Sequence, residues 1–319
     1  MKLYIIGNGF DLHHKMDTTY ASFGLFLKEY NYEVYELLHE HYGFSDLNRL
    51  NQESMSDPLW SEFEKSLSIL DTTTVLEASE DYLPNYSSDE FRDRDRYAFE
   101  FEMEKVLKLL TSELYAAFKQ FILSVEFPVL APHNLIDLDK DALYLNFNYT
   151  DTLYKYYGIS DDNVLFIHEK ARNDEAALIL GHGVDPENFT DKQEVPPKGL
   201  SEEEYEQWVQ YQSDNFDYSY ELGKTMINNY FIETFKSTDK IIEKYSSFFS
   251  NLSSISEVFV LGHSLAEVDL PYFKVLATSL KPQVKWTVTY HSDSDKVKHQ
   301  DVLQILGILN AKVVRMEDI

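Results

Sequence analysis

The 319-residue sequence contains no cysteine. Disulfide bonds, thiolate nucleophiles and cysteine-ligated zinc sites are therefore excluded, because each of them needs a cysteine sulfur. The sequence also lacks a run of about 18 apolar residues, the length needed to span a bilayer. The first predicted strand begins directly after the first residue, so we expect no signal peptide. We therefore expect a soluble, cytoplasmic protein that does not bind a membrane.

Positive charge is scarce, since 28 basic residues stand against 55 acidic ones and the formal net charge is -27. No long basic cluster is present to neutralise a phosphate backbone, so nonspecific binding to DNA or RNA is disfavoured. A small anionic ligand remains compatible with this charge, because salt screens charges beyond roughly 8 Å and local amide groups then control a pocket. Hydrophobic residues make up 44% of the chain, enough for the core of one large domain.

The first apolar stretch, residues 3–6, predicts a strand buried on both faces of a parallel sheet. It leads directly into Gly7-Asn8-Gly9 and then into a helical pattern. Glycine at both positions lets the backbone approach a ligand, and the N–H groups of the following helix would point at a phosphate. The dinucleotide fingerprint is incomplete, because Leu12 occupies the place of its third glycine. The alternative is a tight strand-to-helix turn without a ligand.

Apolar stretches and amphipathic stretches alternate along the chain. Further strands are predicted at residues 142–150, 164–167, 177–180, 257–261, 284–290 and 311–315, and helices at 18–27, 32–41, 97–127, 151–157, 230–249 and 295–306. This alternation predicts an α/β fold with a Rossmann-like parallel sheet flanked by helices. We expect a single domain over residues 1–319, with a helical insertion lobe at about 30–135 and an acidic lid or surface excursion at about 186–220.

Polar residues follow several of the predicted strands. They are Asn146-Phe147-Asn148, His168 and Gly262-His263-Ser264. Because the carboxyl ends of parallel strands meet at one edge, where open α/β sheets bind ligands, we expect these residues to share a site with the opening turn. In the lobe, Trp60 and Phe63 indicate core packing, and Glu64 beside them is the acidic side chain of interest.

Two side chains at the strand ends have the chemistry for catalysis on a sugar. Asn148 could hold a ribose hydroxyl or a water, and His168, with a reference pKa near 6.5, could act as a base. The alternatives are that Asn148 caps the helix predicted from Asp151 and that His168 is a satisfied strand-end histidine. For His182 and His263 a structural role is favoured over a catalytic one. No histidine spacing typical of a metal site is present, and we expect no metal.

The order of these motifs resembles that of the AbiH family of bacterial abortive-infection proteins. The resemblance is carried by Gly7-Asn8-Gly9-Phe10-Asp11, by Trp60 with Phe63-Glu64, by residues 146–153, by Ile167-His168, and by Gly262-His263-Ser264 leading to Asp269. The AbiH family is in turn similar to sirtuin-like NAD-binding folds, which include defence proteins that destroy NAD. In those proteins a strand-end Asn-Tyr and a later histidine carry the chemistry, which corresponds here to Asn148-Tyr149 and His168.

The resemblance implies an anti-phage protein that binds a nucleotide, with NAD as ligand or substrate and nicotinamide and ADP-ribose as products. Asn148 and His168 are then the catalytic residues. The ligand-binding residues are Gly7, Asn8, Gly9, Phe10, Asp11, Tyr149, Thr150, Gly262, His263, Ser264 and Asp269, although Asp269 has the alternative of a helix cap. The other partner implied is a phage-derived trigger. Two other functions stay open: a non-catalytic module that senses a nucleotide or a phage component, and a metal-dependent nuclease.

Overall fold

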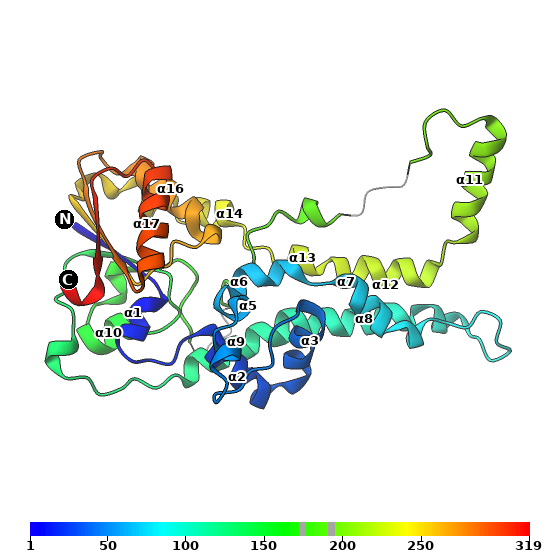
Figure 1. Cartoon of the computed structure of the whole chain (residues 1–319), viewed down its shortest axis with the longest axis horizontal. Helices are drawn as coiled ribbons and strands as arrows, with labels where there is room; N and C mark the ends of the chain where they lie inside the picture. The colour runs from blue at the N-terminus through cyan, green and yellow to red at the C-terminus, as the bar shows by residue number, and fades with distance from the viewer. Residues whose placement is uncertain (173–176, 191–194) are drawn as a thin grey trace.

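The computed structural model describes residues 1–172, 177–190 and 195–319. Its centre is a parallel sheet with the strand order β3-β2-β1-β4-β5-β6. The strands are β1 (Lys2–Ile6), β2 (Leu143–Asn146), β3 (Val164–Phe166), β4 (Glu257–Leu261), β5 (Lys285–Tyr290) and β6 (Ala311–Arg315). Helices flank this sheet (Figure 1), which confirms the α/β class. The order of the strands reverses between β1 and β4, a position at which open α/β sheets bind ligands.

Strand β1 lies in the middle of the sheet, and both of its faces are buried. Leu3 pairs with Leu143 on one side and with Val258 on the other. Leu3 and Ile5 point into a core shared with α14–α17, whereas Tyr4 and Ile6 point into a core shared with α1 and α10. The helices are α1 (Asn8–His13), α10 (Thr152–Tyr157), α14 (Thr238–Lys244), α15 (Ser246–Ser250), α16 (Leu270–Ser279) and α17 (Asp293–Ile305). Because successive side chains of a strand point to opposite faces, β1 contributes to the cores under both helical layers.

A helical lobe lies beside the sheet and extends away from it (Figure 1). Its elements are α2 (Tyr20–Tyr30), α3 (Tyr32–Tyr42), α4 (Gln52–Met55), α5 (Pro58–Ser61), α6 (Phe63–Ser66), α7 (Thr72–Ala78), α8 (Ala98–Lys108), α9 (Leu114–Ser124), α12 (Tyr218–Asn228) and α13 (Tyr230–Glu233). Trp60 and Phe63 are buried in its core, as their pattern indicated. Helix α12 packs along α8, so the lobe combines residues from before β2 and after β3.

Four predicted elements were wrong in whole or in part. The strand predicted over 142–150 ends at Asn146. Residues 177–180 form no strand, and only His182 pairs, through a single bridge to Phe235. The helix predicted over 230–249 is broken into α13, α14 and α15 around this bridge. The helix predicted over 97–127 contains a π-helical segment, Leu109–Glu113, and ends at Ser124.

The acidic segment at about 186–220 contains α11 (Glu202–Asp214), which stands away from the rest of the protein at the far right of Figure 1. Residues 191–194 of that segment lie outside the described residues. Its role as a lid stays a prediction. Among all helices in the described ranges, none is long and apolar enough to cross a membrane.

Candidate functional site

A cavity of about 1900 Å³ lies at the carboxyl edge of the sheet, where the lobe faces it. The sheet side contributes Gly7, Asn148, His168, His263 and Asp269, and the lobe side contributes Tyr20, Glu64, Phe118 and Ile122. The ends of four strands therefore meet as the sequence predicted. The cavity exceeds the 300–1,000 Å³ typical of ligand pockets, so it has room for a ligand of dinucleotide size.

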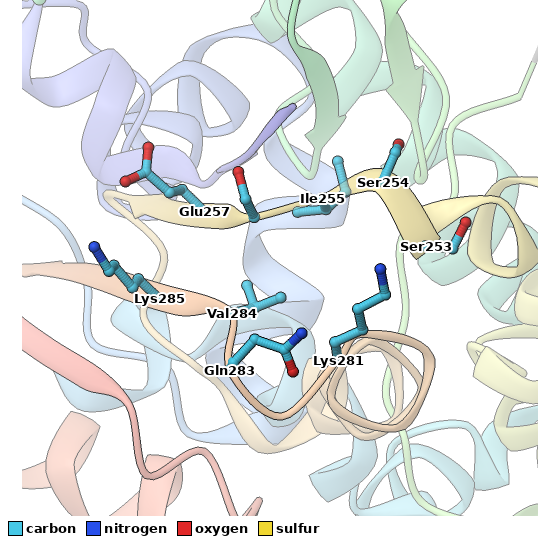
Figure 2. A pocket seen from close by; sticks show the side chains of 9 residues that line it. Ser253, Ser254, Ile255, Glu257, Lys281, Gln283, Val284 and Lys285 are labelled. Atoms are coloured by element: carbon cyan, nitrogen blue, oxygen red, sulfur yellow. The ribbon is translucent and has the colours of Figure 1, made fainter.

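A smaller hollow of about 380 Å³ lies at the opposite edge of the sheet, where β4 and β5 begin. Figure 2 shows its lining, with Ser253, Ser254 and Glu257 on one side and Lys281 and Lys285 on the other. None of these five side chains is buried. Because catalytic and binding groups need desolvated, fixed partners, the cavity at the carboxyl edge is the better candidate.

The opening turn is packed backbone against backbone. The Gly9 N–H donates to the Gly262 carbonyl at 2.7 Å, and the Gly7 N–H donates to the Leu261 carbonyl at 3.0 Å. A Cβ atom on Gly262, whose φ is +66°, would lie 2.1 Å from the Phe10 nitrogen. The glycines at 7, 9 and 262 therefore allow two loops to touch. The N–H groups of Gly7 and Gly9 are engaged within the protein and are not available to a phosphate.

The other residues of the opening turn differ in exposure. Asn8 is exposed, and its Nδ2 donates to the Thr18 carbonyl at 2.9 Å. Phe10 is fully buried in the core beneath α1. Asp11 is also fully buried, and it accepts hydrogen bonds of 2.6 Å from the hydroxyls of Thr150 and Thr152. Burial raises the pKa of Asp11 to about 6, even though these hydroxyls oppose the shift.

Asn148 and Tyr149 follow β2 and are held by backbone carbonyls. The Asn148 Nδ2 donates to the Gly7 carbonyl at 3.1 Å, which ties the end of β2 to the end of β1. The Tyr149 hydroxyl donates to the Ile179 carbonyl at 2.8 Å. The residue at the N-cap of α10 is Asp151 rather than Asn148. Asn148 is therefore fixed at the cavity wall by its hydrogen bond to Gly7, and not as the helix cap that the sequence left open.

A buried ion network lies between the lobe and the sheet. The Lys236 Nζ donates to Glu64 Oε2 at 2.8 Å and to Asp269 Oδ1 at 2.9 Å. Its side chain is 0% exposed, and those of Glu64 and Asp269 are 15% and 12% exposed. The Tyr20 hydroxyl donates to Glu64 Oε1 at 2.7 Å. Every charge in this network thus has a close partner, which buried charges require.

Asp269 is held in its charged form. Burial alone would raise the pKa of Asp269, but Lys236, His263 and His168 outweigh burial and hold that pKa well below its ordinary range. For Lys236, burial would lower the pKa, yet Asp269 and Glu64 raise it. Asp269 is the N-cap residue of α16, but its carboxylate is directed to the lysine and the histidines.

The two histidines next to Asp269 have different environments. His263 accepts a hydrogen bond from the Leu265 N–H on Nδ1 and places Nε2 3.5 Å from Asp269 Oδ2. His168 Nε2 is 3.8 Å from Asp269 Oδ1, and within the described ranges it is a buried nitrogen without a hydrogen-bond partner. Burial, followed by the nearby ammonium of Lys236, lowers the pKa of His168 well below its usual value. His168 is therefore uncharged at neutral pH.

The remaining residues singled out from sequence lie at the margin of the cavity or behind it. Ser264 is exposed and lines the cavity next to His263. His182 is fully buried, and its Nδ1 accepts a hydrogen bond from the Val184 N–H at 3.2 Å. In the part of the chain that the structure describes, no group of three or more histidine, aspartate or glutamate side chains is arranged to hold a metal ion.

The comparison with protein families decides what kind of protein this is. The family described as "Bacteriophage abortive infection AbiH" matches residues 3–290. The chain belongs to the AbiH family. The matched range includes the cavity residues from Gly7 to Asp269. Membership of this family indicates a role in bacteriophage abortive infection. No curated protein and no solved structure matches the chain.

The ion network of this AbiH-family chain contains one residue that sequence reasoning missed. Lys236 lies in no motif and between two helical stretches, and lysines are almost never fully buried. Glu64 was noted only for its position beside Phe63, and Tyr20 only as part of a helical pattern. The signal that identifies Lys236 is its pairing with two carboxylates from distant segments, which the sequence alone does not display.

Proposed function

We propose that this protein acts in abortive infection by binding NAD in the cavity and hydrolysing it to nicotinamide and ADP-ribose. The observation that carries the proposal is the convergence of Asn148, His168 and the Glu64–Lys236–Asp269 network on one cavity. The strand order supports a dinucleotide as ligand, because 3-2-1-4-5-6 is the order of Rossmann-like dinucleotide-binding sheets. The family resemblance to sirtuin-like folds points to the same ligand.

The charges of the network suit the chemistry of this reaction. Cleavage of the bond between nicotinamide and ribose develops positive, oxocarbenium-like character on the sugar. Glu64 and Asp269 against the single ammonium of Lys236 leave an excess of one negative charge beside the cavity. A fixed negative charge in a desolvated site stabilises such a transition state.

Asn148 and His168 supply the remaining functions. The Nδ2 of Asn148 is engaged by Gly7, so its Oδ1 is the atom that would accept a hydrogen bond from a ribose hydroxyl or from water. The water adds to the ribose carbon as nicotinamide leaves, and uncharged His168 takes the proton of that water on Nε2. Basic side chains at the rim, which would face the phosphates, are Lys15, Lys65, Lys298 and Arg315.

The proposal is tested by incubating purified protein with NAD, with and without a phage-derived trigger, and measuring nicotinamide release and NAD binding. His168→Ala should lower turnover by about 100-fold or more, the usual contribution of a general base. Asn148→Ala should lower both turnover and NAD binding. Asn188→Ala, at an exposed position, is the matched control and should leave both unchanged. Absence of NAD binding and of nicotinamide release in every condition would refute the proposal.

The alternative of a non-catalytic sensing module draws on α11. This helix stands away from the body and carries exposed aromatic side chains, Tyr205 and Tyr211 among them. In that case defence against phage would persist in Asn148→Ala and His168→Ala, whereas a charge-preserving change of both tyrosines to serine would abolish it. A plaque assay with these variants separates the two functions.

A further inference from the structure

One carboxylate oxygen of Asp269 faces two nitrogens. The Lys236 Nζ lies 2.9 Å from Asp269 Oδ1, which is hydrogen-bond distance. His168 Nε2 lies 3.8 Å from the same oxygen, too far for a hydrogen bond. Lys236 and His168 thus both lie near Asp269 Oδ1, and only Lys236 forms a hydrogen bond with it. The Lys236 side chain is completely enclosed and does not line the cavity, whereas Asp269 and Glu64 do.

We propose that Lys236 is a positioning residue: by binding Asp269 it keeps this carboxylate from pairing with His168 and leaves His168 Nε2 free to take a proton. The expected effect on turnover rests on the proposed function. The effect of Lys236 on Asp269 and His168 can be tested in the protein without a ligand. It assigns the lysine a role in the acid–base chemistry of the site in addition to its ionic contacts.

The physical reason is the competition between an ammonium and an imidazole for one oxygen. Without Lys236, Asp269 Oδ1 would face His168 Nε2 at 3.8 Å, while Asp269 Oδ2 already faces His263 Nε2 at 3.5 Å. A carboxylate within hydrogen-bond distance favours the protonated imidazolium, because opposite charges stabilise each other. The Nε2 atom would then carry a hydrogen directed at Asp269, and it could no longer accept the proton of a water.

Backbone hydrogen bonds to His182 hold the segment around Lys236 in place. The Lys236 N–H donates to the His182 carbonyl at 2.8 Å, and the His182 N–H donates to the Thr234 carbonyl at 3.0 Å. A Cβ on Gly181 would lie 2.1 Å from the Thr234 oxygen. The residues Gly181-His182 therefore clamp the segment that carries the lysine, and they do so at the break between α13 and α14.

Every titratable group near His168 has to be considered in a test that uses pH. The groups that influence its charge or contact its ring are Lys236 before α14, Asp269 and Tyr272 at α16, His263 after β4, and Tyr149 after β2. Of these, Lys236 and His263 oppose protonation of His168, and Asp269 favours it. Replacing the lysine thus removes a charge that repels protonated His168 and releases Asp269, which attracts it. Both changes raise the pKa of His168.

The direct test is the titration of His168 by ¹⁵N NMR of the histidine side chains in the full-length protein, with His168→Gln used to assign the signal. Lys236→Met should raise the pKa of His168 by at least one unit, which corresponds to about tenfold tighter proton binding. Lys236→Arg keeps a cation on Asp269 and should leave that pKa low. Lys240→Met, on the exposed side of α14, is the matched control and should change nothing.

A double variant, Glu64→Gln with Lys236→Met, guards against loss of fold, because it removes one negative and one positive charge together. It should also raise the pKa of His168, since Asp269 is again released. An unchanged or lower pKa of His168 in a folded Lys236→Met variant or in the double variant would overturn the proposal.

Kinetics provide the second readout. If the protein hydrolyses NAD, the acidic limb of the pH profile of turnover should move up by at least one pH unit in Lys236→Met, with recovery of turnover at higher pH. Lys236→Arg should restore the profile of the original protein. Failure of the proposed function shows as no NAD binding or hydrolysis in the unaltered protein, whereas failure of the present inference shows as an unshifted His168 signal or an unshifted acidic limb.

Discussion

Asp11 and Asp269 are both buried carboxylates next to the same sheet edge, but their partners differ. Asp11, on α1, receives hydrogen bonds from two threonine hydroxyls, and burial raises its pKa to about 6. Asp269 instead faces the ammonium of Lys236 and two histidines, and its pKa is held far below the ordinary range. Hydroxyl donors offset only part of the desolvation that raises the pKa of a buried carboxyl group. The attraction of a buried cation outweighs that desolvation and lowers the pKa.

This difference assigns separate tasks to the two sides of the cavity. Around the opening turn, close glycine packing and neutral hydrogen bonds join β1, β2 and β4 into a fixed wall. On the opposite side, Glu64 of the lobe and Lys236 before α14 bring charges that meet Asp269 of the sheet side. If the proposed function holds, the glycine-packed wall would position the ligand, and the network between lobe and sheet would set the electrostatic field around it.

The largest expected effect comes from breaking the wall. Gly262→Ala should lower the free energy of unfolding by about 4 kcal/mol or more, because its Cβ would overlap backbone atoms of Phe10 and Gly9 at a positive φ. Gly307→Ala is a matched control with φ +71° but with no described atom within 4 Å of the added Cβ. It should cost only about 1 kcal/mol for the left-handed backbone. Urea unfolding measures both, and equal losses would contradict the packing argument.

A smaller loss is expected from removing the carboxylate on the charged side. Asp269→Asn leaves Lys236 buried with Glu64 as its one remaining anion, and it should lower the free energy of unfolding at pH 7 by about 3 kcal/mol. Because the folded pKa of Asp269 is depressed, its stabilisation is present above the unfolded pKa near 3.8 and is lost as the pH falls below that value. The variant should therefore show a weaker fall of stability in acid. Glu267→Gln, exposed and two residues earlier, serves as the control.

The smallest change in the free energy of unfolding at neutral pH is expected for Asp11→Asn, and here the variant should be more stable than the original protein. The folded pKa of about 6 lies above the unfolded value of 3.8, so ionised Asp11 lowers stability by about 3 kcal/mol at pH 7. This cost develops as the pH rises from about 4 to 6. Asparagine avoids it but forgoes one acceptor for Thr150 or Thr152, so we expect a small net gain of about 1 kcal/mol.

Denaturation from pH 4 to pH 7 provides the check for this carboxylate. The original protein should lose the Asp11 contribution across this range, and Asp11→Asn should not. Asp239→Asn, at an exposed position in the first turn of α14, is the control. A variant that keeps the full pH dependence of the original protein would show that Asp11 is not its source.

Sequence periodicity located the strands of the sheet because burial on both faces leaves short apolar runs bounded by polar residues. It also placed Asn148, His168 and His263 at one edge, since parallel strands bring their carboxyl ends together. The same rule failed at residues 177–180, an apolar run in which Leu178 and Leu180 pack into the lobe core without a strand partner. A short apolar run indicates burial, and pairing has to be decided by tertiary contacts.

The charged side of the cavity escaped prediction for a different reason. The helix expected over 230–249 breaks where Phe235 pairs with His182, a contact between segments far apart in the sequence. That break turns Lys236 inward to meet Glu64 and Asp269, which are 172 and 33 residues away. Local propensity cannot report such pairs, because a lysine between two helical stretches has the same local pattern whether it is buried or exposed.

The central position of β1 has a consequence for biosynthesis. Its two neighbours are β2 and β4, and Leu3 pairs with Val258 across 255 residues of chain. At ribosomal rates of about 5–20 residues per second, roughly 10–50 s separate the synthesis of these two strands. Throughout this interval the apolar strand β1 has an unpaired edge, which favours aggregation. We therefore expect the nascent chain to depend on chaperones until β4 has emerged.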